Sequence, residues 1–198
     1  MRILLIGGSG QLGQAIKKYS TKNINLIIPT KKEFNLLDKE DCYEYIINLK
    51  PNWVINSGAY TNVDQAESEK DLVLKINTES PTFIAKALLK TGGKLLHISS
   101  DYIFNGQQSV PYTINQNYSP INFYGRSKAK AEKNLIQILN EENKLCILRT
   151  SWLMSSMENN FASKILKWHE QKEQIKVVYD QVGSPTTTFS LAKVIWRT

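Results

Sequence analysis

The sequence is poor in cysteine and histidine, with two of each among 198 residues. Cys42 and Cys146 lie far apart and lack the short spacing of a metal-binding pair, so we expect reduced thiols and a cytoplasmic protein. His97 and His169 are too few for a histidine-rich zinc centre, and no metal site is predicted. The chemistry of this chain is therefore expected to come from other side chains.

Long apolar runs are also missing from the sequence. No segment approaches the roughly 18 consecutive apolar residues of a membrane-spanning helix, so no membrane association is expected. The apolar N-terminus, residues 1–6, is too short for a signal peptide, has no cleavage site and leads straight into a glycine loop. A hydrophobic content of 41% and a charged content of 22% are typical of a globular domain. The length suffices for one domain, or for one domain and part of a second.

Acidic residues are outnumbered by basic ones, which gives a formal net charge of +7. The lysines are spread along the chain, and no basic stripe with interleaved aromatic residues is present. Nucleic acid is therefore not the expected partner. An anionic cofactor or substrate would suit the charge, and a generally lysine-rich proteome would explain the same excess.

A glycine-rich loop follows the first apolar run. Arg2 to Ile6 predicts a buried strand, Gly7-Gly-Ser-Gly-Gln-Leu-Gly13 follows it, and a helix is predicted from Gln14 to Tyr19. This order is the context of a dinucleotide-binding turn. The glycines let backbone amides approach a pyrophosphate, and the helix N-terminus attracts its negative charge. The loop therefore predicts a bound nicotinamide dinucleotide.

The segment after the second predicted strand, Asn25 to Ile28, bears on which dinucleotide is bound. NAD-binding folds place an acidic residue there to bond the ribose hydroxyls. This chain has Pro29-Thr-Lys-Lys32 instead. The two cations favour the 2′-phosphate of NADP, and a solvated lysine pair on a turn is the alternative. We predict NADPH as cofactor and leave NADH open.

Apolar runs alternate with helical patterns along the remaining chain. Further strands are predicted at Glu33–Leu36, Trp53–Ile55, Lys94–Ser99, Leu145–Leu148 and Ile175–Tyr179, and helices at Asp41–Leu49, Leu72–Leu89, Phe123–Leu139, Phe161–Gln171 and from Phe189. Such alternation predicts an α/β fold with a doubly wound, mostly parallel, Rossmann-like sheet that binds ligands at the C-terminal edge of its strands. We expect residues 1–152 to form the NAD(P)-binding domain and residues 153–198 to form part of a substrate-binding lobe.

Tyr124 and Lys128 lie four residues apart in a predicted helix, so both point into the same space. A neighbouring ammonium favours a phenolate, and we therefore expect Lys128 to lower the pKa of Tyr124 from its usual value of about 10. Ser100, at the end of a predicted strand, would hold a substrate oxygen beside this phenol. A surface tyrosine and lysine on an ordinary helix is the alternative for such a pair alone.

Together these motifs resemble the extended short-chain dehydrogenase/reductase superfamily, and within it the dTDP-4-dehydrorhamnose reductase family. The resemblance covers essentially all of the chain. It rests on Asn56-Ser-Gly-Ala-Tyr-Thr-Asn-Val-Asp-Gln-Ala-Glu67, Ser99-Ser-Asp-Tyr-Ile-Phe104, Tyr124-Gly-Arg-Ser-Lys128, Arg149-Thr-Ser-Trp152, Asn159-Asn-Phe161 and Asp180-Gln-Val-Gly-Ser-Pro-Thr186.

The resemblance implies NAD(P)H-dependent reduction of the C4 ketone of a sugar nucleotide, dTDP-4-dehydro-L-rhamnose, on the route to dTDP-L-rhamnose and cell-surface polysaccharide. In that reaction Tyr124 donates the proton, Ser100 bonds the ketone oxygen and Lys128 holds the nicotinamide ribose. Substrate contacts are implied for Ser100, Asp101 and Trp152. The implied cofactor contacts are Gly7, Gly10, Gln11, Leu12, Gly13, Asn35, Leu36, Ser57, Gly58, Ala59, Tyr124 and Lys128.

The chain departs from the family pattern in several places. Ser100 replaces a threonine, Asn35 stands where many members have an aspartate, and Ser57-Gly58 replaces two alanines. Members continue for roughly another third of this chain's length, a comparison with usual domain sizes. The resemblance therefore implies an incomplete C-terminal substrate lobe. Some members carry acidic Mg²⁺ ligands at a dimer contact in that part, so Mg²⁺ ligands are not evident here and a homodimer is left open.

Two alternatives to the reductase remain. A sugar-nucleotide epimerase of the same superfamily shares the Ser-Tyr-Lys set, whereas a dehydratase is disfavoured because no glutamate follows Asp101. A regulatory subunit that binds NADP without turnover would suit the short C-terminal lobe. The intact Tyr124 and Lys128 argue against such a subunit.

Overall fold

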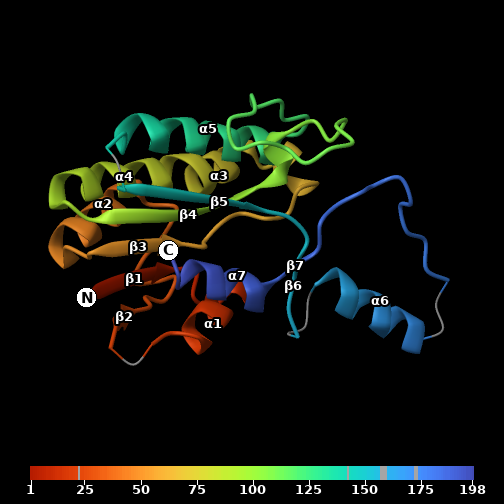
Figure 1. Ribbon diagram of the computed structural model, residues 1–198, viewed down its shortest axis with the longest axis horizontal. Helices are drawn as coiled ribbons and strands as arrows, with labels where there is room; N and C mark the ends of the chain where they lie inside the picture. Colours follow the sequence, from red (N-terminus) through yellow and green to blue (C-terminus); the bar gives the residue numbers. More distant parts are fainter. Residues whose placement is uncertain (22, 142, 157–159, 172–173) are drawn as a thin grey trace.

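A parallel sheet of five strands forms the centre of the computed structural model, which describes residues 1–21, 23–141, 143–156, 160–171 and 174–198. The strand order is β2-β1-β3-β4-β5, with helices on both faces of the sheet (Figure 1). This arrangement confirms the doubly wound, Rossmann-like fold predicted from the sequence. The strands are β1 (Arg2–Ile6), β2 (Asn25–Ile27), β3 (Trp53–Asn56), β4 (Lys94–Ser100) and β5 (Leu145–Thr150).

Each face of the sheet has its own apolar core. Successive strand residues point to opposite faces, so Leu4 packs into one core and Leu5 into the other. The continuous apolar strands follow from this burial on both faces. The first core is covered by α2 (Lys39–Leu49), α4 (Ser80–Thr91) and α5 (Phe123–Ile138), and the second by α1 (Gln11–Lys18) and α7 (Thr188–Ile195).

Two helix starts show how local sequence sets the boundaries. Asp38 caps α2, because its carboxylate accepts a hydrogen bond from the Asp41 amide at 2.9 Å. Helix α1 begins at Gln11 rather than at the predicted Gln14, so its first turn takes in the last glycine of the loop. The helix N-terminus consequently lies closer to the glycine loop than the sequence predicted.

The predicted helix between β3 and β4 is confirmed, with a wider turn inside it. It runs as α3 (Lys70–Leu74), a π-helical turn (Lys75–Glu79) and then α4. Pro81 lies in the first turn of α4, where its lack of a backbone donor is tolerated, and the π turn directly precedes it. Such turns recur at functional sites. This one buries Asn77, which bonds the backbone of Tyr60 and the hydroxyl of Ser127.

Two predicted strands are wrong. Glu33–Leu36 lies in a turn, because the Glu33 carboxylate folds back to accept a hydrogen bond from the Thr30 amide at 2.7 Å. Ile175–Tyr179 pairs with no strand among the described residues, and Tyr179 is 98% exposed. A small parallel sheet of β6 (Leu153–Met154) and β7 (Thr186–Thr187) escaped prediction, because its strands are too short to show a period.

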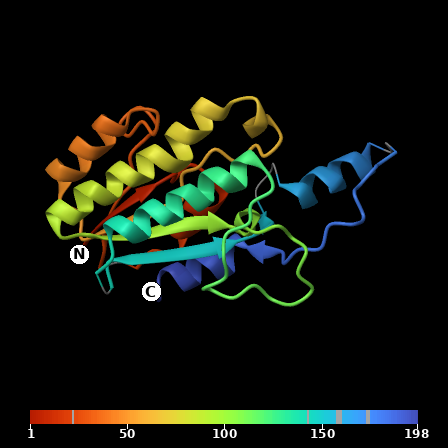
Figure 2. The same ribbon diagram turned by 90° about the horizontal axis from the view of Figure 1, so that it is seen from above.

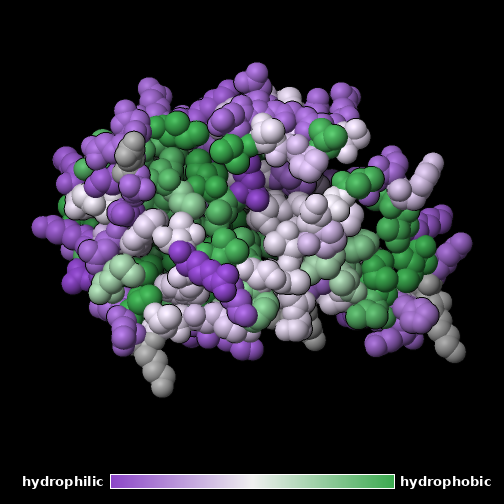
Figure 3. Space-filling model, viewed as in Figure 1, coloured by the Kyte–Doolittle hydropathy of each residue, from purple (hydrophilic) through white to green (hydrophobic). Residues whose placement is uncertain are grey.

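Helix α6 (Phe161–Glu170) extends away from the body of the molecule (Figures 1 and 2). It begins with a capping box between Asn160 and Ser163, whereas Asn159 lies outside the described residues. The helix contains no buried residue, and apolar side chains gather at this end of the molecule (Figure 3). In the part of the chain that the structure describes, no helix combines the length and hydropathy needed to cross a bilayer.

Candidate functional site

A cavity of about 260 Å³ lies at the C-terminal edge of the sheet. Its lining comes from the ends of β3, β4 and β5 and from the N-terminal half of α5, which are far apart in sequence. Parallel strands bring their C-terminal ends together, which explains the convergence. Of the predicted site residues, this cavity is lined by Leu12, Ser57, Ala59, Ser100, Asp101, Tyr124, Lys128 and Trp152.

Helix α5 carries Tyr124 and Lys128 into this cavity. The helix starts at Asn122, whose side chain accepts a hydrogen bond from the Gly125 amide at 2.7 Å. A side chain at Gly125 would meet the Tyr102 carbonyl oxygen, since a Cβ there would lie 2.0 Å away. Glycine at this position therefore lets α5 lie directly against the segment that follows Ser100.

The phenol of Tyr124 is buried, with its ring edge-to-face with Tyr102 at 5.6 Å. Burial raises the pKa of Tyr124 to about 12, the Ser100 hydroxyl opposes this rise, and the charge of Asp101 adds to it. This corrects the expectation that Lys128 lowers the pKa of the phenol. The phenol consequently holds its proton at neutral pH, which suits a proton donor.

Ser100 and Asp101 form a short turn beside the phenol. The Ser100 hydroxyl donates to an oxygen of Asp101 at 3.1 Å and accepts from the Tyr102 amide at 3.2 Å. Burial raises the pKa of the Asp101 carboxyl. The structure thus brings both predicted polar groups to the wall that faces Tyr124.

Lys128 is 2% exposed, and its Nζ atom makes two polar contacts. It donates to the carbonyl oxygen of Ile98 at 2.7 Å and lies 3.2 Å from Nε2 of His97. The other ring nitrogen of His97 lies 3.3 Å from the amide nitrogen of Asn56. Burial lowers the pKa of Lys128 to about 8, and Glu132 opposes the change. Sequence reasoning placed Asn56 in a motif but did not foresee its contact with His97, and it missed His97, although a histidine inside an apolar strand was the visible signal.

The glycine loop lies under the same edge of the sheet and leaves α1 open to an anion. Gly10 caps the helix with no side-chain bond, and no acidic residue occupies the first turn. The amides of that turn are the groups that a phosphate binds at a helix N-terminus. Gly7 and Gly13 pack against backbone, since a Cβ on Gly13 would lie 2.2 Å from the Gly7 oxygen. This loop therefore fits a dinucleotide pyrophosphate.

A methyl group at Gly13 is expected to break this packing. Gly13→Ala forces the loop or α1 to move, and overpacking of this kind costs about 1–3 kcal/mol. Gly10→Ala is the matched control, because its Cβ would approach the nearest atom only to 3.4 Å. Urea unfolding of both variants checks the prediction, and equal stability of the two would contradict it.

Two hydroxyls in the wall of the cavity also fit a polar ligand. Ser99 and Thr150 line the cavity, and their side-chain oxygens are buried without a hydrogen-bond partner among the described residues. A buried hydroxyl without a partner is costly. The cavity thus offers unused polar groups next to Lys128.

Asn35 and Leu36 lie on the adenine side of the predicted cofactor path. Leu36 packs against Gly58, where a Cβ would lie 2.9 Å from its methyl carbon, and Gly58 in turn contacts Gly7. The Asn35 side chain accepts from the Leu37 amide at 3.1 Å and so stabilises the turn. The structure therefore brings Leu36 to the glycine loop, whereas the Asn35 side chain bonds within its own turn.

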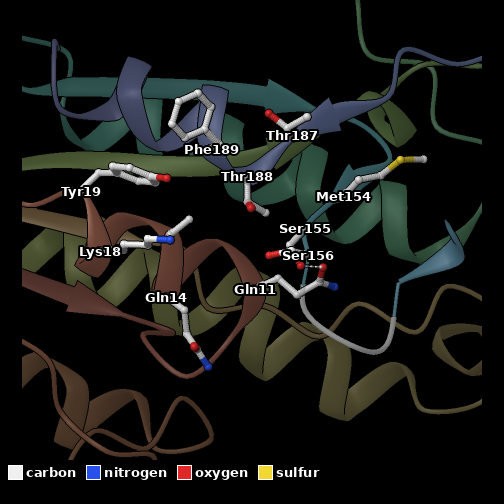
Figure 4. Close-up of a pocket in the computed structure, with 11 residues that line it drawn as sticks. Gln11, Gln14, Lys18, Tyr19, Met154, Ser155, Ser156, Thr187, Thr188 and Phe189 are labelled. Carbon is white, nitrogen blue, oxygen red and sulfur yellow. Dashed lines mark hydrogen bonds between the residues drawn. The ribbon is translucent and has the colours of Figure 1, made fainter. Parts of the chain in front are cut away.

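Gln11 points elsewhere. Its side-chain oxygen accepts from the Ser155 hydroxyl at 2.7 Å, in a second cavity of about 570 Å³ between α1 and the N-terminus of α7 (Figure 4). This cavity is larger, but neither Ser100, Tyr124 nor Lys128 lines it. We assign the chemistry to the smaller cavity, because that one holds the groups able to transfer a proton.

Trp152 follows β5 in a left-handed conformation with φ of 45° and is 39% exposed. The loop through Gly183 lies across its indole, since a Cβ on Gly183 would come within 2.8 Å of the ring. Phe161, at the start of α6, lies at 6.4 Å between ring centroids. Trp152 therefore connects the cavity to the C-terminal segment.

A buried ion pair fixes the long loop beside the site. Arg149 of β5 donates to both oxygens of Glu132, which is fully buried, with a shortest distance of 2.7 Å. Tyr118 donates to the same carboxylate at 3.0 Å, and Arg149 also bonds the Ile114 carbonyl at 3.0 Å. The pair thus joins α5, β5 and the loop of residues 105–122. Sequence reasoning placed Arg149 in a motif but did not foresee its partner.

The parallel sheet, the glycine loop after its first strand and the Ser100, Tyr124 and Lys128 side chains at one edge define a Rossmann-like protein of the extended short-chain dehydrogenase/reductase type. Comparison with known proteins gives the family. The family described as RmlD substrate binding domain matches residues 1–198, and the chain belongs to it.

Its relatives include reductases of known sequence and structure. The chain is 34% identical over 196 residues to dTDP-4-dehydrorhamnose reductase of Aggregatibacter actinomycetemcomitans, and 35% identical over 195 residues to the spore coat polysaccharide biosynthesis protein SpsK of Bacillus subtilis (strain 168). It covers 66% and 68% of these two proteins, which in turn match 98% of this chain. The chain thus spans about two thirds of the length of these curated relatives.

Solved structures agree with this assignment. The dTDP-4-dehydrorhamnose reductase of Clostridium acetobutylicum ATCC 824 is 34% identical, with a TM-score of 0.92 over 100% of this chain and 69% of its own. The Bacillus anthracis str. Ames enzyme, solved in complex with NADP, gives the same identity and TM-score over 99% of this chain and 69% of its own. This chain is therefore a homologue of NADP-binding reductases.

Proposed function

We propose that this chain catalyses NADPH-dependent reduction of the C4 ketone of dTDP-4-dehydro-L-rhamnose. The observation that carries the proposal is the single cavity that holds Ser100, Tyr124 and Lys128 beside residues of the glycine-loop side. Relatives with this activity in their names match nearly the whole chain. The chain is shorter than these relatives, so its substrate and its activity are proposed here. We also propose that residues 1–152 bind the cofactor and that residues 153–198 form part of the substrate-binding lobe.

In this proposal the protein side chains manage the proton. Tyr124 donates its proton to the ketone oxygen, because burial keeps the phenol protonated at neutral pH. The Ser100 hydroxyl bonds the same oxygen and orients it. Lys128 holds the ribose next to the nicotinamide, and Asp101 and Trp152 contact the sugar nucleotide. NADPH, when bound, supplies the hydride.

The turn after β2 supports the choice of NADPH. Lys31 and Lys32 are exposed there, and the acid that follows them, Glu33, is folded onto the Thr30 amide. We expect the double substitution Lys31→Glu/Lys32→Glu to weaken NADPH binding by about tenfold, because it places negative charge near a phosphate. NADH binding is expected to change far less. Fluorescence titration with both cofactors measures this, and equal losses for the two would exclude these lysines as the 2′-phosphate site.

The test of the function is NADPH oxidation by this chain with dTDP-4-dehydro-L-rhamnose. Turnover that requires both compounds is the expected result. A dTDP-sugar epimerised without net oxidation of cofactor would favour the epimerase alternative. NADPH binding without turnover would favour the regulatory subunit, and absence of NADPH binding would remove the proposal.

A requirement for Mg²⁺ and the formation of a homodimer are separate questions for experiment. The described residues contain no cluster of three or more His, Cys, Asp or Glu side chains able to hold a metal ion. Turnover with and without a chelator, and the mass of the chain in solution, decide these two points.

A further inference from the structure

A continuous row of buried polar groups runs from the cofactor side of the sheet to Lys128. It begins at the Gly58 amide, passes through the Asn56 side chain and the His97 ring, and ends at the amine of Lys128. Asn56, His97 and Lys128 are each at most 2% exposed. Because such groups lack bulk water, each hydrogen in the row has to find an acceptor within it.

The positions of these hydrogens follow from the chemistry of the end groups. The Gly58 amide can only donate, so the Asn56 atom that faces it at 3.1 Å is the oxygen. The Asn56 nitrogen therefore faces His97, and since it can only donate, Nδ1 of the ring must accept. Burial lowers the pKa of His97 well below its usual value, so the ring is neutral. A neutral ring that accepts at Nδ1 carries its hydrogen on Nε2.

The Nε2 hydrogen points at Lys128, 3.2 Å away. An ammonium has three donors and no acceptor, so it would oppose this hydrogen, whereas an uncharged amine has a lone pair to accept it. The amine still has hydrogens to donate to the Ile98 carbonyl. Only the uncharged amine satisfies the whole row at once.

We propose that His97 is a positioning residue whose tautomer is linked to the charge of Lys128. With the Asn56–His97 bond intact, Lys128 is an uncharged amine, and it gains a proton only as His97 moves its hydrogen from Nε2 to Nδ1. This inference rests on the proposed function only for the catalytic meaning of Lys128. An uncharged amine is able to take up a proton from a hydroxyl placed beside it, which a resting ammonium cannot do.

The surroundings of Lys128 place both charge states within reach. Burial lowers its pKa to about 8, and one pKa unit corresponds to about 1.4 kcal/mol, the size of a typical hydrogen-bond contribution. The charged or titratable groups around it include His97 on β4, Asp101 and Tyr102 in the wall of the same cavity, and Tyr124 one turn earlier on α5. Glu132 lies one turn later on α5, and its charge is paired with Arg149. A hydrogen bond to His97 is therefore strong enough to decide whether Lys128 is charged or uncharged.

The experiment is NMR spectroscopy of the ligand-free chain, with labelled histidine and lysine, from neutral to alkaline pH. All spectra are recorded in the His169→Gln variant. His169 is exposed on α6, and its removal leaves His97 as the one imidazole in the chain. Lys128 is assigned by Lys128→Met. We expect the ring hydrogen to move from Nε2 to Nδ1 in the same transition in which Lys128 takes up its proton, as coupled groups do.

Two substitutions reverse the polarity of the row. In Asn56→Asp the carboxylate only accepts, so His97 is expected to keep its hydrogen on Nδ1 throughout, and Lys128 to bind its proton at least about tenfold more tightly. His97→Gln places a side-chain carbonyl opposite Lys128 and is also expected to strengthen proton binding by Lys128. This second variant provides the test if Asn56→Asp does not fold. His97→Leu, which removes the hydrogen bond without supplying an acceptor, is not expected to strengthen proton binding.

Two results would overturn the inference. One is a His97 ring that carries its hydrogen on Nδ1 at every pH in the parent chain. The other is a Lys128 titration that is unchanged in the folded polar variants. Neither measurement uses substrate or turnover. The NMR result therefore stands even if the proposed reductase activity is not found, and the activity can be tested even if the NMR result contradicts this inference.

Discussion

Tyr124→Phe is expected to lower turnover by at least about 100-fold, the size of a general acid contribution, while NADPH affinity stays within a few-fold. The hydroxyl is the only part removed, and the ring keeps its edge-to-face contact with Tyr102. Burial holds the pKa of this phenol near 12, so at neutral pH the parent is protonated and ready to donate. Steady-state NADPH oxidation and fluorescence titration of the same preparation measure the two quantities.

Tyr102→Phe is the matched control for this experiment. Tyr102 lines the same cavity and packs against Tyr124, but its ring follows Ser100 in the chain and does not belong to the proposed proton-transfer set. Its loss is expected to change turnover only a few-fold. If both variants kept full turnover, Tyr124 would lose its proposed role. If both lost activity equally, packing rather than proton donation would explain the effect.

Arg149→Met is expected to destabilise the fold by about 3–5 kcal/mol, because it leaves the fully buried Glu132 carboxylate without its counter-charge. The methionine keeps apolar contact with the rings of Phe104 and Tyr118, which flank the guanidinium at 5.4 and 5.5 Å. The loss is therefore electrostatic and not a loss of packing. Urea unfolding followed by circular dichroism measures it.

The structure offers a control pair for this substitution. Arg126 and Glu67 lie 3.5 Å apart on the surface with side chains about half exposed, and such pairs contribute about 0–1 kcal/mol. Arg126→Met is consequently expected to be nearly neutral. A double substitution Arg149→Met/Glu132→Leu should recover much of the lost stability, since it removes the unpaired charge as well. Equal effects of the buried and the surface arginine would contradict this account.

The sequence predicted the sheet because its signals are periodic and local. The apolar runs of β1, β3, β4 and β5 and the helical spacing of α2 and α5 were all confirmed. The two wrong strands failed for different reasons. Glu33 prefers a side-chain bond to the Thr30 amide. Val177 and Val178 are exposed and find no neighbouring strand among the described residues.

The part of the site that lies at the C-terminal ends of the strands was predictable, because parallel strands bring these ends together. The Tyr124 and Lys128 spacing on α5 and the position of Ser100 after β4 placed them in one cavity. The partners of Lys128 and Glu132 were not predictable, because His97 and Arg149 are separated from them by 31 and 17 residues and no local pattern connects them. Burial also changed the sign of the pKa shift of Tyr124, and burial depends on the whole fold.

Helix α7 completes the apolar core that α1 covers only in part, so this core forms late in synthesis of the chain. Leu191 and Ile195 pack with Ile16, and the Trp196 indole donates to the Ile16 carbonyl across 180 residues of chain. One face of the sheet is thus only partly covered until the residues of α7 have been synthesised. Contacts of such long range slow folding and leave apolar surface exposed during synthesis. The nascent chain is therefore a natural client for chaperones until α7 has emerged.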